Sequence, residues 1–259
     1  MNTESLPRGD LLDITFTTPA PDEAVGWILG RNRGGYVCLA NVHVTMEARD
    51  DASFAGVLAG AWMVLPDGKP VAFALRRLGF QARQVRGPTL AEDICSAAAR
   101  AGVPIGLYGG RPEVIARLLE ILPQRHPGLL IAYAWSPPFR TLTEDEQAAA
   151  LDAISASTAR VLLVGLGCPK QERWMARYHT ALNMPLVGVG AWFDFSSGTV
   201  REAPVWLQRA GFEWLHRLCQ QPGRLWRRYA IHNPRFCWLV GRAWLRYFWT
   251  RFWFRSTAP

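Results

Sequence analysis

Residues 160–172 read Arg-Val-Leu-Leu-Val-Gly-Leu-Gly-Cys-Pro-Lys-Gln-Glu, and this stretch decides the fold. A short aliphatic run is followed at once by a glycine loop and then by a proline that can open a helix. This order predicts a strand, a tight turn and a helix, which together form the repeating unit of a parallel sheet. Residues 105–122 repeat the order, with a strand over 105–108, Gly109-Gly110, and a helix over 112–122.

Apolar runs alternate with helical patterns on both sides of these two units. Strands are predicted at 36–40, 61–65, 129–133 and 185–189, and helices at 44–60, 71–78, 90–102 and 144–155. Such alternation indicates βαβ units in a sheet that helices cover on both faces. We therefore predict an α/β fold, with a Rossmann-like parallel sheet sandwiched by helices over residues 1–203. A C-terminal helical appendage is predicted over residues 204–259.

The positive charge of the chain is concentrated in this appendage. Residues 205–259 hold ten arginines, no lysine and one acid, Glu213, for a net charge of +9, whereas the whole chain carries +8. The same residues include fourteen tryptophans, tyrosines and phenylalanines. Arginine beside such side chains is typical of helices that lie on an anionic membrane surface. Pro222-Gly223 and Asn233-Pro234 predict helix breaks, and hence about three short helices.

Other partners for the appendage are less consistent with its sequence. Arg242, Arg246 and Arg251 interrupt the apolar stretch, and each costs about 2.5–3.5 kcal/mol at the centre of a membrane-spanning helix. The absence of lysine and the density of tryptophan argue against nucleic acid. Packing of the aromatic residues against the body, or a homo-oligomer interface, is the remaining alternative to the membrane surface.

The remaining composition indicates no metal and no disulfide framework. The five cysteines are widely spaced without a Cys-x-x-Cys pair, and the five histidines show no spacing typical of metal ligands. Residues 1–10 are polar and contain no apolar run like that of a signal peptide. A reducing cytoplasm is therefore the expected compartment.

The two glycine loops are candidate ligand sites. Gly109, Gly110 and Gly167 let the backbone approach a ligand, and the N–H groups of the helices that follow favour phosphate. Both loops follow strands, at the end of the sheet where α/β proteins bind ligands. Pro169 and Lys170 interrupt the dinucleotide fingerprint, and a Walker lysine is absent, which favours a nucleotide other than NAD or ATP.

Several motifs then follow one another in the order of a known family. They are Pro66-Asp-Gly68, Arg86-Gly87, Gly165-Leu-Gly-Cys-Pro-Lys-Gln-Glu-Arg-Trp174, Gly188-Val-Gly-Ala-Trp-Phe-Asp194, Arg201-Glu-Ala-Pro204, Glu213-Trp-Leu-His-Arg217 and Arg224-x-x-Arg-Arg-Tyr229. Over about residues 11–229 the chain resembles the WecG/TagA/CpsF glycosyltransferases, which build bacterial surface polymers. The final aromatic stretch is less typical of that family.

The resemblance implies transfer of a sugar, with inversion, from a UDP-sugar donor to a sugar on a polyprenyl diphosphate. It also implies that no metal or other cofactor takes part, which agrees with the absence of an Asp-x-Asp motif. The appendage of such enzymes contacts the membrane and completes the active site. We therefore expect a peripheral protein on the cytoplasmic face of the plasma (inner) membrane, with a role in exopolysaccharide or related polymer synthesis.

The resemblance also assigns residues. Asp67 is the expected general base, although Pro-Asp-Gly by itself is an ordinary turn sequence. The expected donor or nucleotide contacts are Asn41, Arg86, Gly109, Gly110, Gly167, Lys170, Gln171, Glu172 and Asp194. The expected contacts to the diphosphate or to the lipid-linked acceptor are Arg217, Arg224 and Arg227, for which membrane headgroups are the alternative. Leu39 stands where many members have threonine, which leaves the donor sugar open.

UDP-glucose, UDP-N-acetylmannosamine and its uronic acid are the candidate donors, and the Pro-Asp-Gly-Lys-Pro segment looks most like members that transfer glucose. Two other functions are considered. A nucleotide-dependent oxidoreductase would need a ribose-binding acid after a complete glycine fingerprint, and none is in place. A non-catalytic membrane adaptor of a polysaccharide assembly complex would bind membranes without turnover.

Overall fold

A parallel sheet lies at the centre of the computed structural model, which describes residues 6–256 except for the side chains of Arg224 and residues 250–256. In this part of the chain six strands pair in the order β4-β3-β8-β7-β5-β6, all parallel. They are β3 (Gly35–Ala40), β4 (Met63–Pro66), β5 (Ile105–Gly109), β6 (Ile131–Trp135), β7 (Val161–Gly165) and β8 (Pro185–Gly188). An antiparallel hairpin of β1 (Arg8–Leu11) and β2 (Ile14–Thr17) lies beside β4.

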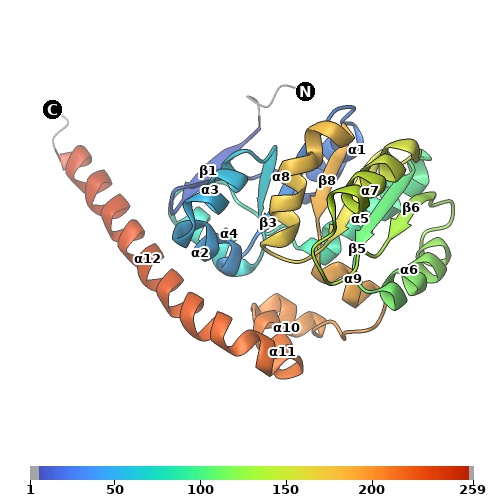
Figure 1. Ribbon diagram of the computed structural model, residues 1–259. Coiled ribbons are helices and arrows are strands. Elements are labelled where there is room, and N and C mark those ends of the chain that lie inside the picture. Colours follow the sequence, from blue (N-terminus) through green and yellow to red (C-terminus); the bar gives the residue numbers. More distant parts are fainter. Residues whose placement is uncertain (1–5, 257–259) are drawn as a thin grey trace.

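Helices cover both faces of this sheet (Figure 1). One face packs against α1 (Pro21–Leu29), α5 (Gly87–Ala101), α6 (Pro112–Arg125) and α9 (Ala191–Ser196). The other packs against α2 (Val42–Asp50), α3 (Ala52–Ala59), α4 (Lys69–Arg77), α7 (Glu144–Ala156) and α8 (Lys170–Leu182). Neighbouring strand residues belong to opposite cores, Val37 to the first and Cys38 to the second. The predicted sandwiched α/β sheet is confirmed.

Local hydrogen bonds shift some predicted boundaries. The helix predicted over 44–60 is divided at Asp51, whose carboxylate accepts hydrogen bonds from the N–H groups of Ser53 and Phe54 and so begins α3. The strand predicted over 129–133 runs from Ile131 to Trp135 instead.

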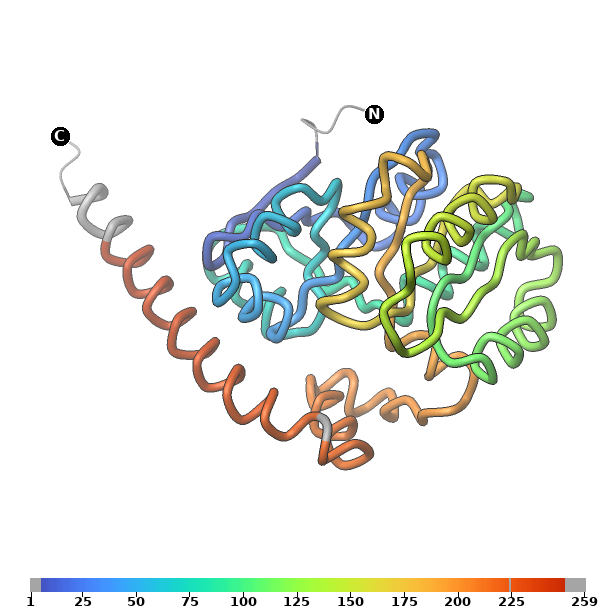
Figure 2. The backbone as a smooth tube through the Cα atoms, in the orientation of Figure 1, coloured from blue at the N-terminus to red at the C-terminus, as the bar shows by residue number. Residues whose placement is uncertain are grey.

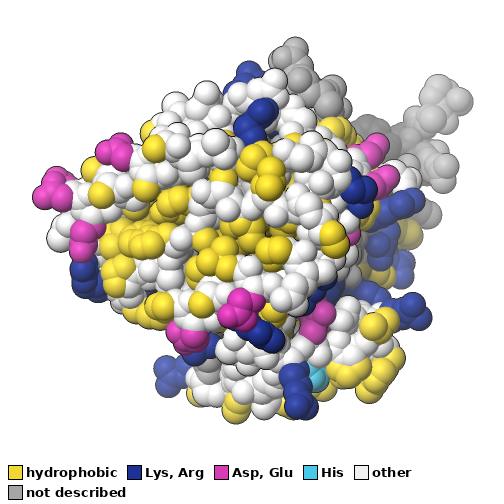
Figure 3. All heavy atoms as spheres, turned by 90° about the vertical axis from the view of Figure 1, so that its right-hand side faces the viewer, with side chains coloured by type: hydrophobic (Ala, Val, Ile, Leu, Met, Phe, Trp, Pro, Cys, Tyr) yellow, Lys and Arg dark blue, Asp and Glu magenta, His cyan; other side chains and the backbone are white. Residues whose placement is uncertain are grey.

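The strand β6 forms one edge of the sheet and pairs with β5 alone among the described strands. All five of its residues are partly exposed. The side of the molecule that carries β6 presents a broad group of hydrophobic side chains (Figure 3), and Leu130 and Phe139 are exposed. Homo-oligomer formation, for which the aromatic residues of the C-terminal segment are the predicted interface, stays a prediction.

The C-terminal segment forms two short helices and one long helix, α10 (Val205–Ala210), α11 (Glu213–Gln220) and α12 (Pro222–Ser256). The predicted break at Pro222 is confirmed, but the break predicted at Asn233-Pro234 is wrong, because α12 continues through Pro234 (Figure 2). Proline removes one helical hydrogen bond. Contacts just beyond it offset this loss, since Arg235 pairs with Asp50 of α2 at 2.5 Å and Phe236 is buried.

The two sides of α12 differ in chemistry. Phe236 belongs to the core of the body, with Leu239 and Val240 packed partly against it. An exposed stripe runs along the opposite side, because its members recur at helical spacing: Ile231, Trp238, Arg242, Leu245 and Trp249. The Arg242 guanidinium lies 4.6 Å from the Trp238 ring centroid. Among the described residues, no helix is both long enough and apolar enough to span a bilayer.

Phe236→Ala should weaken the docking of α12 by about 3 kcal/mol, because it removes a fully buried ring. Limited proteolysis within α12 and urea unfolding would measure the loss. Trp238→Ala, two residues away and 59% exposed, is the matched control and should leave both measurements unchanged. Equal effects of the two substitutions would contradict the docked arrangement.

Candidate functional site

A cavity of about 1020 Å³ lies at the carboxyl edge of the sheet. Its walls come from the loops that follow β3, β4, β5, β7 and β8, because parallel strands end at one edge. Residues of α11 and α12 complete the wall on the appendage side. Of the predicted site residues, the cavity is lined by Asn41, Asp67, Arg86, Gly110, Gly167, Lys170, Gln171, Glu172, Asp194 and Arg217.

Asp67 follows β4 directly, and its N–H donates to the carbonyl of Ala40 at 3.1 Å. This bond places Asp67 beside Asn41, which follows the neighbouring strand β3. The Asn41 Oδ1 caps α2 by accepting hydrogen bonds from the N–H groups of His43 and Val44, at 3.1 and 3.3 Å. The Asn41 Nδ2 donates to Asp67 Oδ2 at 3.4 Å. Asn41, which caps α2, therefore also orients the Asp67 carboxylate.

The surroundings of Asp67 make its carboxyl group a stronger base than a free aspartate. Burial raises the pKa of Asp67, and the negative charge of Glu213 raises it further. The hydrogen bond from Asn41 and the charges of Arg217 and Arg86 act in the opposite direction without cancelling the rise. A carboxylate with a raised pKa, facing a cavity, is suited to remove a proton from a bound group.

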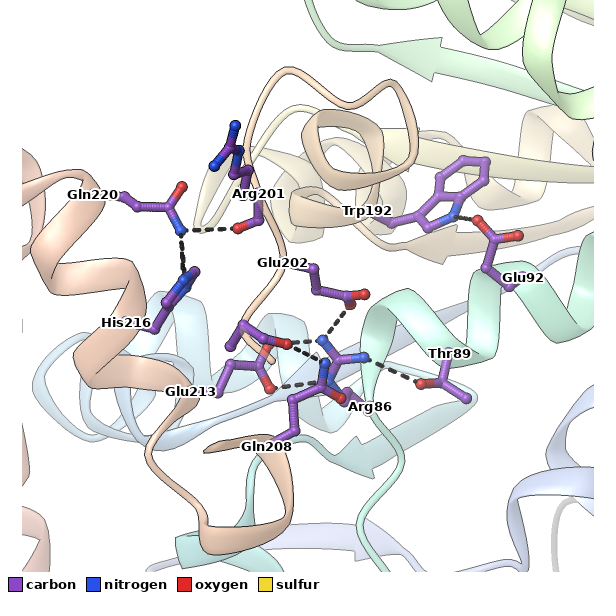
Figure 4. A network of polar contacts seen from close by, with 11 residues as sticks. Arg86, Thr89, Glu92, Trp192, Arg201, Glu202, Gln208, Glu213, His216 and Gln220 are labelled. Atoms are coloured by element: carbon purple, nitrogen blue, oxygen red, sulfur yellow. Dashed lines mark hydrogen bonds and ion pairs between the residues drawn. The ribbon is translucent and has the colours of Figure 1, made fainter. Parts of the chain in front are cut away.

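Arg86, at the N-terminus of α5, connects the body to the C-terminal segment (Figure 4). Its Nε and Nη2 each donate to a Glu213 carboxylate oxygen at 2.9 Å, and Nη2 also contacts Glu202. Nη1 donates to Thr89 at 3.3 Å. The paired acids raise the pKa of Arg86 against the opposing effect of burial. Arg86, the predicted contact to the donor, lines the cavity and is also paired with two carboxylates.

The glycine loops bring backbone close to backbone. At Gly109 φ is 127°, and a Cβ atom there would lie 2.5 Å from the carbonyl carbon of Gly165, so only glycine fits. Gly109 itself does not line the cavity, whereas Gly110 does and donates its N–H to Gly165 at 3.0 Å. Gly167, with φ of 77°, also lines the cavity. The close contact of the two loops brings Gly110, Gly165 and Gly167 to the wall of the same cavity.

Gln171 and Glu172 begin α8 and are both buried. Gln171 Oε1 accepts a hydrogen bond from the N–H of Gly167 at 3.2 Å, and its Nε2 donates to Glu172 Oε1 at 2.9 Å. Burial raises the pKa of Glu172, whose Oε2 has no hydrogen-bond partner among the described residues. Lys170 is exposed at the rim of the cavity. Gln171 and Glu172 therefore hold the glycine loop in shape and also line the cavity.

Asp194 lies in the first turn of α9, half-buried at the cavity wall. A residue that the sequence did not single out holds this short helix in place. Glu92 of α5 accepts hydrogen bonds from Trp192 Nε1 at 2.8 Å and from the Ser196 hydroxyl at 2.7 Å, both in α9. These partners are 100 and 104 residues away in the sequence, so no local pattern could reveal the contact.

The appendage arginines occupy different places. Arg217 of α11 lines the cavity, with its guanidinium 5.4 Å from the Phe195 ring centroid. Arg227 is exposed, lies 5.4 Å from the Trp226 ring and does not line the cavity. The side chain of Arg224 lies outside the described residues. Arg228 was missed by the sequence analysis, yet it lines the cavity and donates to Asn41 Oδ1 at 3.4 Å.

Arg228 directly follows Arg227 in the Arg-Arg-Tyr motif. Neighbouring residues of a helix point in different directions, so only knowledge of which side of the helix faces the body could have shown that Arg228 lines the cavity and Arg227 does not. Together, Arg217 and Arg228 place two guanidinium groups at a cavity that also holds the Asp67 carboxylate. Guanidinium groups bind diphosphates by paired hydrogen bonds. The cavity can therefore hold a phosphorylated ligand beside a base.

The residues that line the cavity lie within a stretch of the chain that matches known proteins. The family model described as "Glycosyl transferase WecG/TagA/CpsF family" matches residues 9–249, which include the whole cavity. The chain is also 31% identical over 231 residues to a protein of Bacillus spizizenii, N-acetylglucosaminyldiphosphoundecaprenol N-acetyl-beta-D-mannosaminyltransferase. That alignment covers 88% of this chain and 87% of the relative.

Glu213→Gln should lower the pKa of the Asp67 carboxyl, because it removes a nearby negative charge and frees Arg86 to act on Asp67. A pH titration of the carboxyl carbon of Asp67, followed by nuclear magnetic resonance, would measure the change. Glu202→Gln removes another acid that pairs with Arg86 and is the control, with a smaller expected change. An unchanged pKa in Glu213→Gln would contradict the electrostatic coupling.

Proposed function

This chain belongs to the WecG/TagA/CpsF family and is a glycosyltransferase, and we propose that it transfers a sugar from a UDP-sugar to N-acetylglucosamine on a polyprenyl diphosphate. The single observation that carries the proposal is the position of Asp67. It stands at the carboxyl end of β4, in a cavity that Arg217 and Arg228 of the appendage also line. A base can take the proton of the acceptor hydroxyl, and cations can stabilise the leaving diphosphate.

The acceptor is inferred from the printed name of the Bacillus spizizenii relative, which acts on N-acetylglucosaminyldiphosphoundecaprenol. The same name supports N-acetylmannosamine as the transferred sugar, whereas the Pro-Asp-Gly-Lys-Pro segment favours glucose. Leu39 is close to the cavity wall and differs from the threonine common in the family. The product is proposed to serve exopolysaccharide or related surface-polymer synthesis.

The proposed reaction is a single displacement. The Asp67 carboxylate takes the proton of the acceptor hydroxyl while that oxygen attacks the anomeric carbon of the donor. The bond between the anomeric carbon and the UDP oxygen breaks, and the configuration inverts because attack and departure occur on opposite faces. Arg217 and Arg228 stabilise the charge that develops on the leaving diphosphate, which removes the need for a metal at that position.

Asp67→Asn should lower kcat by about 10²- to 10⁴-fold, because the amide cannot accept the proton, and should leave UDP binding intact. The measurement is UDP release from UDP-linked glucose, N-acetylmannosamine and its uronic acid. Short-chain polyprenyl-diphosphate N-acetylglucosamine and glucose serve as acceptors, without added Mg²⁺ or Mn²⁺. The productive pair identifies the donor and the acceptor, and the anomeric configuration of the product tests inversion.

Asp93→Asn is the matched control, because Asp93 is exposed on α5 and does not line the cavity. Full activity in Asp67→Asn would remove Asp67 from its proposed role. A folded wild-type protein that binds membranes and releases no UDP with any pair would instead favour the adaptor function.

Residues 1–203 are proposed as the transferase domain and 204–259 as a membrane-binding appendage at the cytoplasmic face of the plasma (inner) membrane. The exposed stripe of α12 supports this, since it points away from the body and combines two tryptophans with an arginine. Indole rings and guanidinium groups are suited to the headgroup region of anionic bilayers. A peripheral position would bring the cavity close to a lipid-linked acceptor.

The double substitution Trp238→Ser and Trp249→Ser should weaken binding to anionic liposomes by about 100-fold, since each buried large apolar side chain contributes about 1.5 kcal/mol or more. Co-sedimentation with vesicles of phosphatidylglycerol and phosphatidylethanolamine would measure it. Phe73→Ser, at an exposed phenylalanine of α4, is the control and should bind normally. Unchanged binding of the double variant would exclude the stripe as the contact surface.

A further inference from the structure

A cluster of three potential ligands joins α12 to the body. His43 and Glu47 lie one turn apart on α2, and His232 lies on α12. Glu47 Oε1 is 3.6 Å from His43 Nδ1 and 3.6 Å from His232 Nε2. The two imidazole centroids are 5.2 Å apart, and one ligand atom from each of the three residues lies within 4.8 Å of the others. Among the described residues, no other group of histidines, cysteines and acids comes this close.

One nitrogen of each histidine lacks an ordinary partner. The Nδ1 atoms of His43 and His232 are buried and form no hydrogen bond with any described residue. Of these two atoms, His43 Nδ1 is the one that faces Glu47, whereas His232 faces Glu47 through Nε2. Both side chains are only 14% exposed. A buried nitrogen without a partner is costly, so native structures normally satisfy such atoms. The 3.6 Å separations are longer than hydrogen bonds but suit two ligand atoms that share one metal ion, each about 2.0–2.1 Å from it.

Glu47 is the central member of the cluster, since its Oε1 is equally distant from a nitrogen of each histidine. Its carboxylate is the one acidic group of the three, and a carboxylate oxygen beside two imidazole nitrogens is a usual ligand set for a divalent cation.

We infer that His43, Glu47 and His232 bind a first-row divalent cation, best matched by Zn²⁺, that fastens α12 to α2. Two imidazoles and one carboxylate are typical zinc ligands, and a fourth position remains for water. Mg²⁺ and Ca²⁺ prefer sites built from oxygen, so the two imidazoles select against them. The spacing of the histidines showed no metal site, because His43 and His232 lie far apart in the chain and only folding brings them together.

A second contact between α2 and α12 lies next to the proposed metal site. Asp50 and Arg235 form an ion pair three residues beyond Glu47 and His232. A bound ion would therefore extend an existing interface. His43 borders the cavity, while Glu47 and His232 do not line it, so the ion acts on the docking of α12 and not on the leaving diphosphate. This inference does not rest on the proposed function.

The test uses the full-length protein, freed of metal by a chelator and then titrated with Zn²⁺ in competition with a chromophoric chelator. One equivalent should bind, and Zn²⁺ should slow proteolysis within α12. His232→Gln and Glu47→Gln should each lower the affinity by more than the 10–100-fold that loss of an outer hydrogen-bond partner costs. Circular dichroism of the metal-free variants, unchanged from wild type, would establish that they fold.

Matched controls separate this site from other ligands. His216→Gln replaces a half-buried histidine of α11 outside the cluster, and Cys219→Ser with Cys237→Ser removes two exposed thiols. All should retain binding, and the Co²⁺ complex should show tetrahedral visible bands without thiolate charge-transfer absorption. Zinc binding that persists in both His232→Gln and Glu47→Gln, or is lost with the cysteines, would overturn the inference, as would no binding by the wild type.

Discussion

The ion pairs of Arg86 with Glu202 and Glu213 are the interaction on which the arrangement of this protein depends. They join the start of α5 to two points of the C-terminal segment, more than a hundred residues away. Hydrogen bonds to charged groups contribute about 1.5–3 kcal/mol each, and the bidentate geometry to Glu213 fixes orientation as well. Because the guanidinium is largely buried, losing either side of the network would leave an uncompensated charge.

This network also determines the chemistry of the cavity. Glu213 is held by Arg86 at a position where its charge raises the pKa of Asp67, while α11 carries Arg217 to the same cavity. The proposed base and the cations therefore come from parts of the chain that are separate in sequence. In the proposed reaction, docking of the C-terminal helices brings them to one cavity.

One side of the long helix α12 packs against the body, and the opposite side is exposed. Phe236 and Arg235 hold it against α2, and Arg228 reaches Asn41, the residue that caps α2 and orients Asp67. The opposite side leaves tryptophans exposed beside Arg242. In the proposed function, contact with a membrane on that side, and with the cavity on the other, would bring a lipid-linked acceptor close to Asp67.

The sequence by itself determined the parts that depend on neighbouring residues. Aliphatic runs before glycine loops identified the parallel strands, and the position of Asp67 and Gly110 at strand ends placed them at one edge of the sheet. Charge counting located the appendage, since net charge is a property of composition. Asn41, Gln171 and Asp194 were also predicted as site residues, through the resemblance of their motifs to a family, and all three line the cavity.

Only the tertiary structure decided which of these residues meet. It selected Arg228 over the adjacent Arg227, because the docking of α12 sets which side of the helix faces the cavity. It continued α12 through Pro234, since contacts with α2 outweigh one lost hydrogen bond. The roles of Glu92 and His232 likewise depend on partners 100 or more residues distant, and no local pattern in a chain encodes such pairings.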